Sequence, residues 1–586
     1  MIFPAFLQFL LVASMYTSRS AAALALLGFS LVSQAVNIQN PGHDSPFPMP
    51  ACHGHQLEDA EVAQIQRWYS SGALTVRQVV SCYLARISQV DPYVNAVMEL
   101  NPDALEIAEL LDKELTSGKR RGPMHGIVVM VKDNFATADK MQTTAGSLAL
   151  VGSIVPRDAH VVHLLRESGA VILGHAGMSE WADMRSTSYS EGYSARGGQV
   201  RNSYNLTQEP GGSSSGSGHS VTTNMATVAY GTETDGSIIS PAERANIVGI
   251  KPTVGLTSRA GIIPESANQD TVGAFGRTVE DAAYALDAVW GFDWRDEATL
   301  EQLGKTPDNY TQFVSKKGAL AGMKVGIPWE RLWQGKTTSH QIPALLEAVN
   351  ILKQHGVEVH NNTNYKHVKE IVSPSGWDWS YGPANQSELT VVNVDFYNNL
   401  AAYLSELGNT TIRSLEDLVA FNEAANNVVS EGGEPDIAAA FASGQDGFLA
   451  SLATKGIQNS TYKQALIWCR RTSRAEGIDY ALNPVMSDGR VVHLDALLIP
   501  SDDNGAGTNI PAQAGYPIIT IPIGIDDWHT PFGLSFVGTA FSEPTLIKLA
   551  SAAEDALGKR RVRPTFYEYN ATNIPVNWAF GTYNYL

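Results

Sequence analysis

The sequence predicts a single large α/β domain that takes up most of the 586 residues. From about residue 51 onward, short apolar runs with the length of buried strands alternate with longer segments of helical periodicity. No fixed-period repeat and no low-complexity linker divides this part of the sequence. Hydrophobic residues make up 44% of the chain, which is enough for a deep core at this length. We therefore expect a globular α/β protein.

The first predicted element is a helix that begins after Thr75. Thr75 and Gln78 have the spacing of a capping box, in which each residue satisfies a free backbone N–H group of the other. Val79, Tyr83 and Ile87 then fall on one face of the helix. This face is expected to pack on the core.

A strand, a helix and a second strand come next. Residues 127–131 are apolar, as in a buried strand, and Lys132 stands at the carboxyl end of this run. Residues 160–168 have helical periodicity, Gly169 ends that segment, and residues 170–173 are again apolar. This order is typical of a βαβ unit.

The same alternation returns in the second half of the chain. A predicted helix with Leu345, Val349 and Leu352 on one face ends near Gly356. The later predicted elements are strands at 357–360, 496–499, 518–521 and 534–537 and a helix at 546–557. We expect a polar, peripheral insertion somewhere within residues 293–459.

The amino terminus carries two apolar runs, residues 1–13 and 21–36. The second run follows Arg19 and ends in Ser33-Gln34-Ala35, so it has the charged, apolar and small-residue parts of a secretory signal. We expect a signal peptide at 1–35, an N-terminal extension at 36–54 and the main domain at 55–586. An uncleaved membrane anchor is the alternative, but neither run reaches the ~18 to 20 apolar residues that span a bilayer.

Glycosylation motifs and cysteine usage also fit a secreted protein. Three cysteines, Cys52, Cys82 and Cys469, allow at most one disulfide and form no metal-binding pattern. Acceptor triplets for N-glycosylation begin at Asn205, Asn309, Asn361, Asn385, Asn409, Asn459 and Asn570.

The charge of the chain argues against nucleic acid as a partner. The formal net charge is −18 with only 41 Lys and Arg residues, and no local basic cluster could follow a phosphate backbone. A stable membrane partner is not expected either, and the oligomeric state is left open.

Two glycine-flanked serine turns stand close together in the middle of the chain. Residues 211–218 read Gly-Gly-Ser-Ser-Ser-Gly-Ser-Gly, and residues 231–237 read Gly-Thr-Glu-Thr-Asp-Gly-Ser. The first turn is not a phosphate loop, because Ser217 and Gly218 occupy the positions that need Lys and Ser or Thr. It is not a dinucleotide fingerprint either, because Val221 replaces the third glycine.

A nucleophile elbow and a flexible loop are two further interpretations of the first turn. Residues 212–216 match Gly-x-Ser-x-Gly with Ser214 at the centre, as in esterases. Such an esterase needs an acid and a histidine further along, for which Asp495 or Asp502 with His529 could be nominated. Glycine and serine clusters are, however, more often flexible loops than active sites.

Several motifs together resemble the amidase signature family. The Gly-Ser loop is followed by Gly-Thr-Glu-Thr-Asp-Gly-Ser-Ile and by Gly-Ile-Lys-Pro-Thr-Val-Gly at 249–255, while residues 126–134 are similar to the lysine motif of that family. Residues 141–147, 178–182, 421–423 and 514–517 are similar to further family landmarks. The resemblance covers roughly residues 55–560 and implies one α/β/α domain around a twisted mixed sheet.

The resemblance also implies a Ser-Ser-Lys triad. The nucleophile falls on Ser237, and the proton relay falls on Ser213 and Lys132. A lysine can serve as the base only when it is neutral, so burial would have to lower its pKa well below ~10.4. Without the family motifs, a lysine with its charge at the surface of a strand edge would be the simpler interpretation of Lys132. In the family, the peptide bond before the residue equivalent to Ser213 is cis, and Gly212 suits this position.

The second turn is the expected oxyanion hole. Backbone N–H groups of Thr234, Asp235, Gly236 and Ser237 would bind the developing negative oxygen. Asp235 stands where the family usually has glycine, and it could reorient the turn or form a hydrogen bond near Lys132. In this respect the chain resembles the subgroup that includes peptide amidases and secreted fungal amidases.

The implied reaction is hydrolysis of a carboxamide to a carboxylate and an amine or ammonia, through an acyl-enzyme on Ser237 and without metal or other cofactor. A small-molecule or peptide amide is the expected substrate, and its pocket could involve Trp181, Met184, Trp377, Trp379 and Tyr381. One alternative is the amide-transferring component of a glutamine-dependent tRNA amidotransferase, and another is an inactive binding relative.

Overall fold

The computed structural model describes residues 45–334, 340–424, 440–501, 506–558 and 560–568. The predicted signal peptide, most of the N-terminal extension, Asp502 and Asn570 lie outside these ranges. Everything described belongs to one compact unit that spans Asn40–Leu586.

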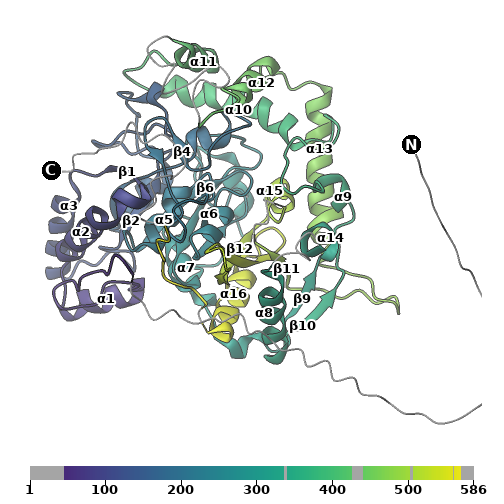
Figure 1. Ribbon diagram of the computed structural model, residues 1–586, viewed down its shortest axis with the longest axis horizontal. Coiled ribbons are helices and arrows are strands. Elements are labelled where there is room, and N and C mark those ends of the chain that lie inside the picture. The colour runs from purple at the N-terminus through teal and green to yellow at the C-terminus, as the bar shows by residue number, and fades with distance from the viewer. Residues whose placement is uncertain (1–44, 335–339, 425–439, 502–505, 559, 569–586) are drawn as a thin grey trace, which may run out of the picture. The chain divides into compact units, whose positions relative to one another are not determined.

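A mixed sheet of eleven strands runs through this unit (Figure 1). Parallel pairs such as β2 (Val128–Lys132) with β3 (Val171–Ala176) and antiparallel pairs such as β6 (Val228–Glu233) with β8 (Thr271–Gly276) both occur, as expected for a large mixed sheet. Across the sheet, the strands are β1 (Val97–Leu100), β3 (Val171–Ala176), β2 (Val128–Lys132), β6 (Val228–Glu233), β8 (Thr271–Gly276), β7 (Val248–Lys251), β12 (Ile518–Ile525), β13 (Pro531–Val537), β11 (Ala496–Pro500), β9 (Lys324–Ile327) and β10 (Glu358–Asn361). A separate two-stranded pair joins β4 (Tyr193–Ser194) and β5 (Gly198–Gln199).

Helices flank this sheet on both faces. Adjacent residues of a strand point to opposite faces. On β7, a Cβ placed at Gly249 would meet Ala242 of α6 (Ile239–Arg244), while its neighbours Val248 and Ile250 pack in one apolar cluster with Leu286 of α7 (Val279–Asp287). The α/β/α architecture is therefore as predicted. The helices are α1 (Val62–Ser71), α2 (Val76–Val94), α3 (Ala104–Thr116), α4 (His160–Glu167), α5 (Ser215–Thr222), α6 (Ile239–Arg244), α7 (Val279–Asp287), α8 (Ile342–Gln354), α9 (Val368–Ile371), α10 (Glu388–Glu406), α11 (Leu415–Glu423), α12 (Asp446–Thr454), α13 (Ser460–Ser473), α14 (Asp479–Ala481), α15 (Asn509–Ala514) and α16 (Glu543–Leu557).

The range in which we expected a peripheral insertion contains two different parts. β9, α8 and β10 belong to the main architecture, because β9 pairs with β11 and extends the edge of the sheet. By contrast, α10, α11 and α12 share a separate apolar cluster with the segment around Trp181. These three helices lie together at the top of Figure 1, and α10 brings a side chain to the site described below.

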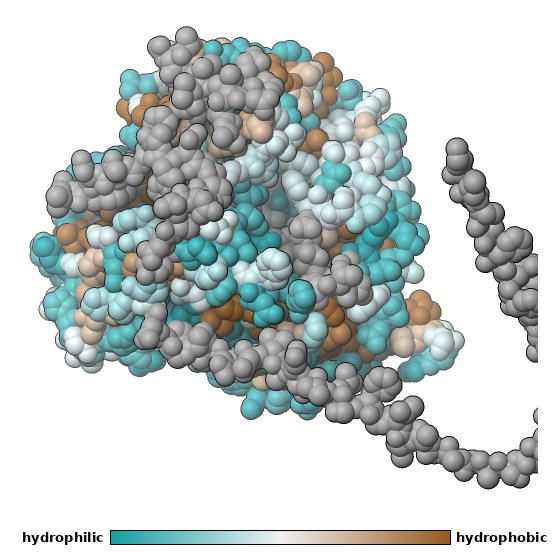
Figure 2. All heavy atoms as spheres, viewed as in Figure 1, coloured by the Kyte–Doolittle hydropathy of each residue, from teal (hydrophilic) through white to brown (hydrophobic). Residues whose placement is uncertain are grey.

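The visible face of the molecule in Figure 2 carries mostly hydrophilic residues. On the face that Figure 2 shows, hydrophobic residues are scattered among hydrophilic ones. Within the ranges given above, no helix is both long and apolar enough to cross a membrane.

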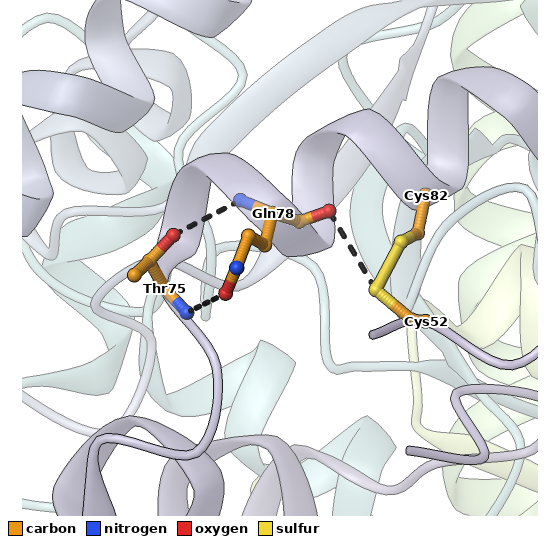
Figure 3. Close-up of a disulfide and its surroundings, with 4 residues drawn as sticks. All are labelled: Cys52, Thr75, Gln78 and Cys82. Carbon is orange, nitrogen blue, oxygen red and sulfur yellow. Dashed lines mark hydrogen bonds between the residues drawn. A yellow bond between two sulfur atoms is a disulfide. The ribbon is translucent and has the colours of Figure 1, made fainter. Parts of the chain in front are cut away.

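A disulfide joins the chain before α1 to helix α2. Cys52 and Cys82 are bonded, with their Cα atoms 5.8 Å apart, and Cys469 is a buried free thiol. Figure 3 shows this bond beside the predicted capping box, in which Thr75 Oγ1 accepts from the N–H of Gln78 and Gln78 Oε1 accepts from the N–H of Thr75. The single disulfide that the cysteine count allows is thus formed.

We expect reduction of this disulfide to lower the free energy of unfolding by about 3 kcal/mol, because the bond closes a loop across a sequence separation of 30. Urea unfolding with and without a reducing agent measures the effect. Cys82→Ser is the matched control, since its stability should no longer respond to the reducing agent. An equal response of the wild type and Cys82→Ser would contradict the expectation.

Candidate active site

Lys132, Ser213 and Ser237 form a continuous hydrogen-bonded chain. Lys132 Nζ donates to Ser213 Oγ at 2.7 Å, and Ser213 Oγ donates to Ser237 Oγ at 2.9 Å. Lys132 ends β2, Ser213 precedes α5, and Ser237 lies in the turn between β6 and α6. Because β2 and β6 are parallel neighbours, their carboxyl ends lie at the same edge of the sheet. The structure therefore brings together the three residues of the predicted triad, and the Gly212–Ser213 peptide bond is cis.

Lys132 lies entirely inside the protein, so the alternative of a surface lysine is wrong. Its side chain is 0% exposed, and Nζ also donates to Thr232 Oγ1 at 3.0 Å. Burial lowers the pKa of Lys132 to about 8, because the low-dielectric surroundings disfavour the ammonium form. The negative charges of four acidic residues act in the opposite direction, namely Glu265, Asp183, Asp270 and Glu191.

The turn that carries Ser237 is held by two buried carboxylates. Glu233 Oε2 accepts from the backbone N–H groups of Ile238 and Ile239, and so fixes the start of α6. Thr234 Oγ1 donates to Asp270 Oδ1 at 2.6 Å. Gly236 has φ +85°, a conformation that other residues rarely adopt. The predicted oxyanion-hole residues Thr234, Asp235 and Gly236 thus lie in a turn of defined geometry beside the nucleophile.

Asp235 contacts two elements far away in the sequence and not Lys132. Its Oδ2 accepts from Trp377 Nε1 and from Asn509 Nδ2, each at 2.7 Å. Asn509 also donates to Glu388 Oε2 at 3.2 Å, so that α15 bridges the turn and the start of α10. Burial raises the pKa of Asp235 to about 7, since it disfavours the charged form.

Gly212 has no room for a side chain. A Cβ at this position would come within 1.7 Å of Glu191 Oε2 and 2.6 Å of Ser179 Oγ. Ser179 Oγ donates to Glu191 Oε2 at 2.8 Å, and the N–H of Ser179 donates to the carbonyl of Ser213 at 3.1 Å. Ser179 and Glu191 therefore hold the loop that carries Ser213 in place.

Gly212→Ala should lower kcat/KM for amide hydrolysis by about a hundredfold, because the displaced Glu191 would shift the Ser213 loop by the order of an ångström. Amide hydrolysis and thermal unfolding of the variant are measured together. Gly122→Ala is the matched control, since a Cβ at Gly122 meets no atom within 4 Å. Wild-type kinetics in Gly212→Ala would show that the contacts of Ser179 and Glu191 with this loop do not contribute to activity.

A cavity of about 390 Å³ opens beside this chain of residues. Gly212 and Gly236, the neighbours of the two triad serines, are part of its wall. Trp377 and the carboxylates of Asp183, Glu191 and Asp235 also line it. Its volume suits a small ligand or the end of a larger one.

The residues nominated for a nucleophile elbow do not come together. Ser214 Oγ is buried and donates to the carbonyl of Thr232 at 3.1 Å. The ring of His529 stacks on Tyr567, and Asp495 accepts from the backbone N–H of Lys324. Asp502 is outside the described residues. The arrangement therefore does not support an esterase centred on Ser214.

Sequence reasoning missed most of the acidic residues around the site. Asp183, Glu191, Glu265, Asp270 and Glu388 come from loops and from α10, and no local pattern marks residues that meet only through the tertiary fold. Among the aromatic residues suggested for the pocket, Trp377 does line it. Trp181 and Met184 instead belong to the apolar cluster that includes side chains of α10.

The comparisons define the class of the protein. A family model described as Amidase matches residues 78–547. The chain therefore belongs to the amidase family. It is an amidase that hydrolyses C–N bonds of carboxamides.

Individual relatives agree with this class. The chain is 55% identical over 539 residues to a putative amidase of Schizosaccharomyces pombe, covering 90% of each chain. The solved structure of a peptide amidase from Stenotrophomonas maltophilia has 39% identity and a TM-score of 0.78, and the match covers 89% of this chain and 100% of that one. A glutamyl-tRNA(Gln) amidotransferase component of Alkaliphilus metalliredigens is 30% identical over 514 residues, covering 86% of this chain and 97% of that protein.

Proposed function

We propose that Ser237 is the nucleophile of this amidase and that Ser213 and Lys132 move its proton. The observation that carries the proposal is the unbroken chain of hydrogen bonds, 2.7 Å and 2.9 Å long, from a buried lysine through one serine to another. Nucleophile and base lie within the reach that proton transfer requires. Lys132 would act as the general base, which is the role of histidine in other serine hydrolases.

The direction of the hydrogen bonds depends on the charge of Lys132. When Lys132 is protonated, its Nζ donates to Ser213 and Ser213 donates to Ser237 across these two hydrogen bonds. Once Lys132 loses its proton, the chain can reverse, so that Ser237 donates to Ser213 and Ser213 donates to the neutral amine. Only the reversed chain draws the proton away from the attacking oxygen.

The proposed reaction then has two halves. Ser237 Oγ bonds to the carbonyl carbon, while its proton passes to Ser213 and the proton of Ser213 passes to Lys132. The C–N bond breaks as a proton returns through Ser213 to the leaving nitrogen, which departs as ammonia or an amine. Water then bonds to the carbonyl carbon of the acyl-enzyme while one of its protons passes through Ser213 to Lys132. The bond between that carbon and Ser237 Oγ breaks as the proton returns to Oγ, and the released acid ionises to the carboxylate.

Backbone N–H groups of the turn 234–237 are proposed to bind the oxyanion. The turn follows β6 and precedes α6, so its N–H groups lie near the positive end of a short helix, close to Ser237 Oγ. The positive φ of Gly236 gives this turn the concave shape that an anion needs. Thr234, Asp235 and Gly236 thereby keep the role expected of them.

Release of ammonia by the isolated chain tests the proposal. We expect the purified protein to convert a simple primary amide to carboxylate and ammonia in equal amounts, without tRNA or a further polypeptide. The resemblance to a glutamyl-tRNA(Gln) amidotransferase component favours the amide-transferring alternative. Activity that appears only with glutamine and a tRNA-binding partner would establish that alternative and overturn ours.

We also propose that the protein is secreted and N-glycosylated. The disulfide between Cys52 and Cys82 supports this, because such bonds persist in oxidising compartments. Four acceptor residues are exposed, namely Asn361, Asn385, Asn409 and Asn459, whereas Asn205 is only 6% exposed. Peptide mapping of the protein from a eukaryotic culture medium should find a mature start near residue 36 and glycans on exposed acceptors. Retention of residues 1–35 in a cell-bound protein would overturn the proposal.

The pH dependence of hydrolysis should follow Lys132. We expect kcat/KM for a neutral amide to rise with pH through about 8, because burial lowers the pKa of Lys132 to about 8 and only the neutral amine accepts a proton. Below that pKa, the ammonium form predominates and kcat/KM should fall about tenfold per pH unit. Measurement of kcat/KM from about pH 6 to 10 tests this expectation. A profile that falls with pH across this range would contradict the proposed base.

A further inference from the structure

The cavity beside the triad has more acidic than basic residues on its wall. Four carboxylates line it, those of Asp183, Glu191, Glu209 and Asp235. In the part of the chain that the structure describes, Arg244 is the one basic residue on the wall of this cavity. Gly212 and Gly236, the chain neighbours of Ser213 and Ser237, form part of this wall, so a ligand in the cavity can reach the two serines.

Arg244 forms an ion pair with one of these carboxylates, that of Glu209. Arg244 Nε donates to Glu209 Oε1 at 2.8 Å. Within the described ranges, none of Asp183, Glu191 and Asp235 has a basic group within ion-pair distance. Burial raises the pKa of Asp183 to about 7 and holds that of Glu191 well above its ordinary value, while the positive charge of Lys132 acts in the opposite direction on Asp183.

Two of the carboxylates also leave an oxygen without a partner. Oδ1 of Asp183 and Oδ1 of Asp235 are buried, and neither accepts a hydrogen bond from a described residue. Buried polar atoms are almost always hydrogen-bonded in native proteins, so an unpaired carboxylate oxygen on a cavity wall requires a reason. A ligand that donates hydrogen bonds into the cavity supplies that reason.

The backbone from Trp181 to Asp183 has an unusual conformation. Trp181, Ala182 and Asp183 have φ values of 52°, 52° and 81°, so three consecutive residues other than glycine lie in the left-handed region. Such backbone costs of order 1 to 3 kcal/mol per residue and persists where the surroundings enforce it, often at functional sites. Trp181 and Ala182 anchor this turn in the apolar cluster, and Asp183 follows them to the cavity wall.

We propose that this cavity selects primary amides whose acyl chain carries an ammonium group. An ammonium has three donors and one positive charge, so it can donate to the unpaired oxygens of Asp183 and Asp235 and offset the repulsion that Glu191 experiences from Asp183 and Glu209. The partly apolar wall at Trp377 and Tyr189 suits the alkyl chain that joins the ammonium to the amide. This inference rests on the proposed function, since it places the scissile amide at Ser237.

A matched pair of substrates tests the selection. γ-Aminobutyramide and valeramide have the same length and differ only in an ammonium group that replaces a methyl group. We expect wild-type kcat/KM at about pH 8 to be at least about tenfold higher for the cationic amide, as one charge-assisted hydrogen bond would provide. A ratio near one or below it would overturn the proposal.

Two variants should move this ratio in opposite directions. Asp183→Asn removes a carboxylate from the wall and should lower the ratio about fivefold or more. Arg244→Gln releases Glu209 and removes the positive charge, so it should raise the ratio severalfold. Asp488→Asn is the control, because it makes the same chemical change at an exposed surface residue and should leave the ratio unchanged. An unchanged ratio in Asp183→Asn and Arg244→Gln would overturn the proposal.

A binding measurement separates this proposal from the catalytic one. Calorimetric titration of the Ser237→Ala protein with both amides gives the charge preference without turnover. Tighter binding of γ-aminobutyramide supports the inference even if no amide is hydrolysed, which would contradict only the proposed catalytic roles. Equal or weaker binding of γ-aminobutyramide overturns the inference, whatever the rate of hydrolysis.

Discussion

Ser237→Ala is expected to lower kcat for amide hydrolysis by about a thousandfold or more, while the protein stays folded. The alanine variant lacks the oxygen that forms the acyl-enzyme, and the remaining residues can only orient water weakly. Little else should change, because the side chain of Ser237 is 4% exposed and its described hydrogen bond is the one with Ser213. Ammonia release from a primary amide and circular dichroism of the variant measure both parts of the expectation.

Ser214→Ala is the matched control for this variant. It removes the same hydroxyl group from a buried serine only one residue after Ser213. The hydrogen bond that Ser214 donates to the carbonyl of Thr232 would be lost, which should cost about 1 kcal/mol of stability. Activity should remain within about tenfold of the wild type. Loss of activity only in Ser214→Ala would establish the nucleophile elbow instead.

Lys132→Met is the second variant for which we expect a very large effect. Removal of the base should lower kcat by about 10² to 10⁴, because Ser213 then has no acceptor for its proton. Methionine keeps the length and the apolar stem of the side chain, so that packing around β2 is preserved. The rise of kcat/KM with pH through about 8 should disappear in whatever activity is left.

Lys251→Met is a closely matched control for Lys132→Met. Lys251 is likewise 0% exposed, and burial lowers its pKa to about 8 as well. It differs in its contacts, since its Nζ donates to the carbonyl of Tyr516 at 2.7 Å. Lys251→Met should therefore lose stability but retain kcat within about tenfold in the folded protein. Equal losses of kcat in both lysine variants would mean that Lys132 acts only through stability.

Residues that are close together in the sequence were sufficient to predict the strand that ends at Lys132 and the helices and strand on either side of it in the chain. The capping box of Thr75 and Gln78, the helix at 160–168 and the strands before Lys132 and after Gly169 all appear near the predicted positions. Each depends on residues that are close together in the sequence, such as a cap, a stop or an apolar run. The roles of Ser213 and Ser237, however, came from the family motifs and not from periodicity.

Strands β7 and β8 escaped prediction because glycine interrupts them. Glycine weakens the strand signal in a sequence, yet here it is required by packing. A Cβ at Gly249 would come within 2.6 Å of Ala242 Cβ, and one at Gly273 within 2.2 Å of the carbonyl oxygen of Ile250. These neighbours come close to Gly249 and Gly273 only in the folded sheet. The sequence alone therefore does not show why glycine is needed at these positions.

The acidic wall of the cavity could not be predicted for a similar reason. Asp235 of this wall accepts a hydrogen bond from Asn509, which begins α15 more than two hundred residues further on. A buried carboxylate and a solvated one look the same in a sequence, because burial depends on distant segments. The substrate preference that we infer therefore became visible only in the three-dimensional structure.

Covalent labelling tests the central claim most directly. A serine-directed phosphonylating reagent reacts with the activated nucleophile, and peptide mapping by mass spectrometry identifies the modified residue. We expect the label on Ser237, at a rate that falls sharply in Lys132→Met but not in Lys251→Met. A label on Ser213 or Ser214, with Ser237 unmodified, would contradict the proposed roles.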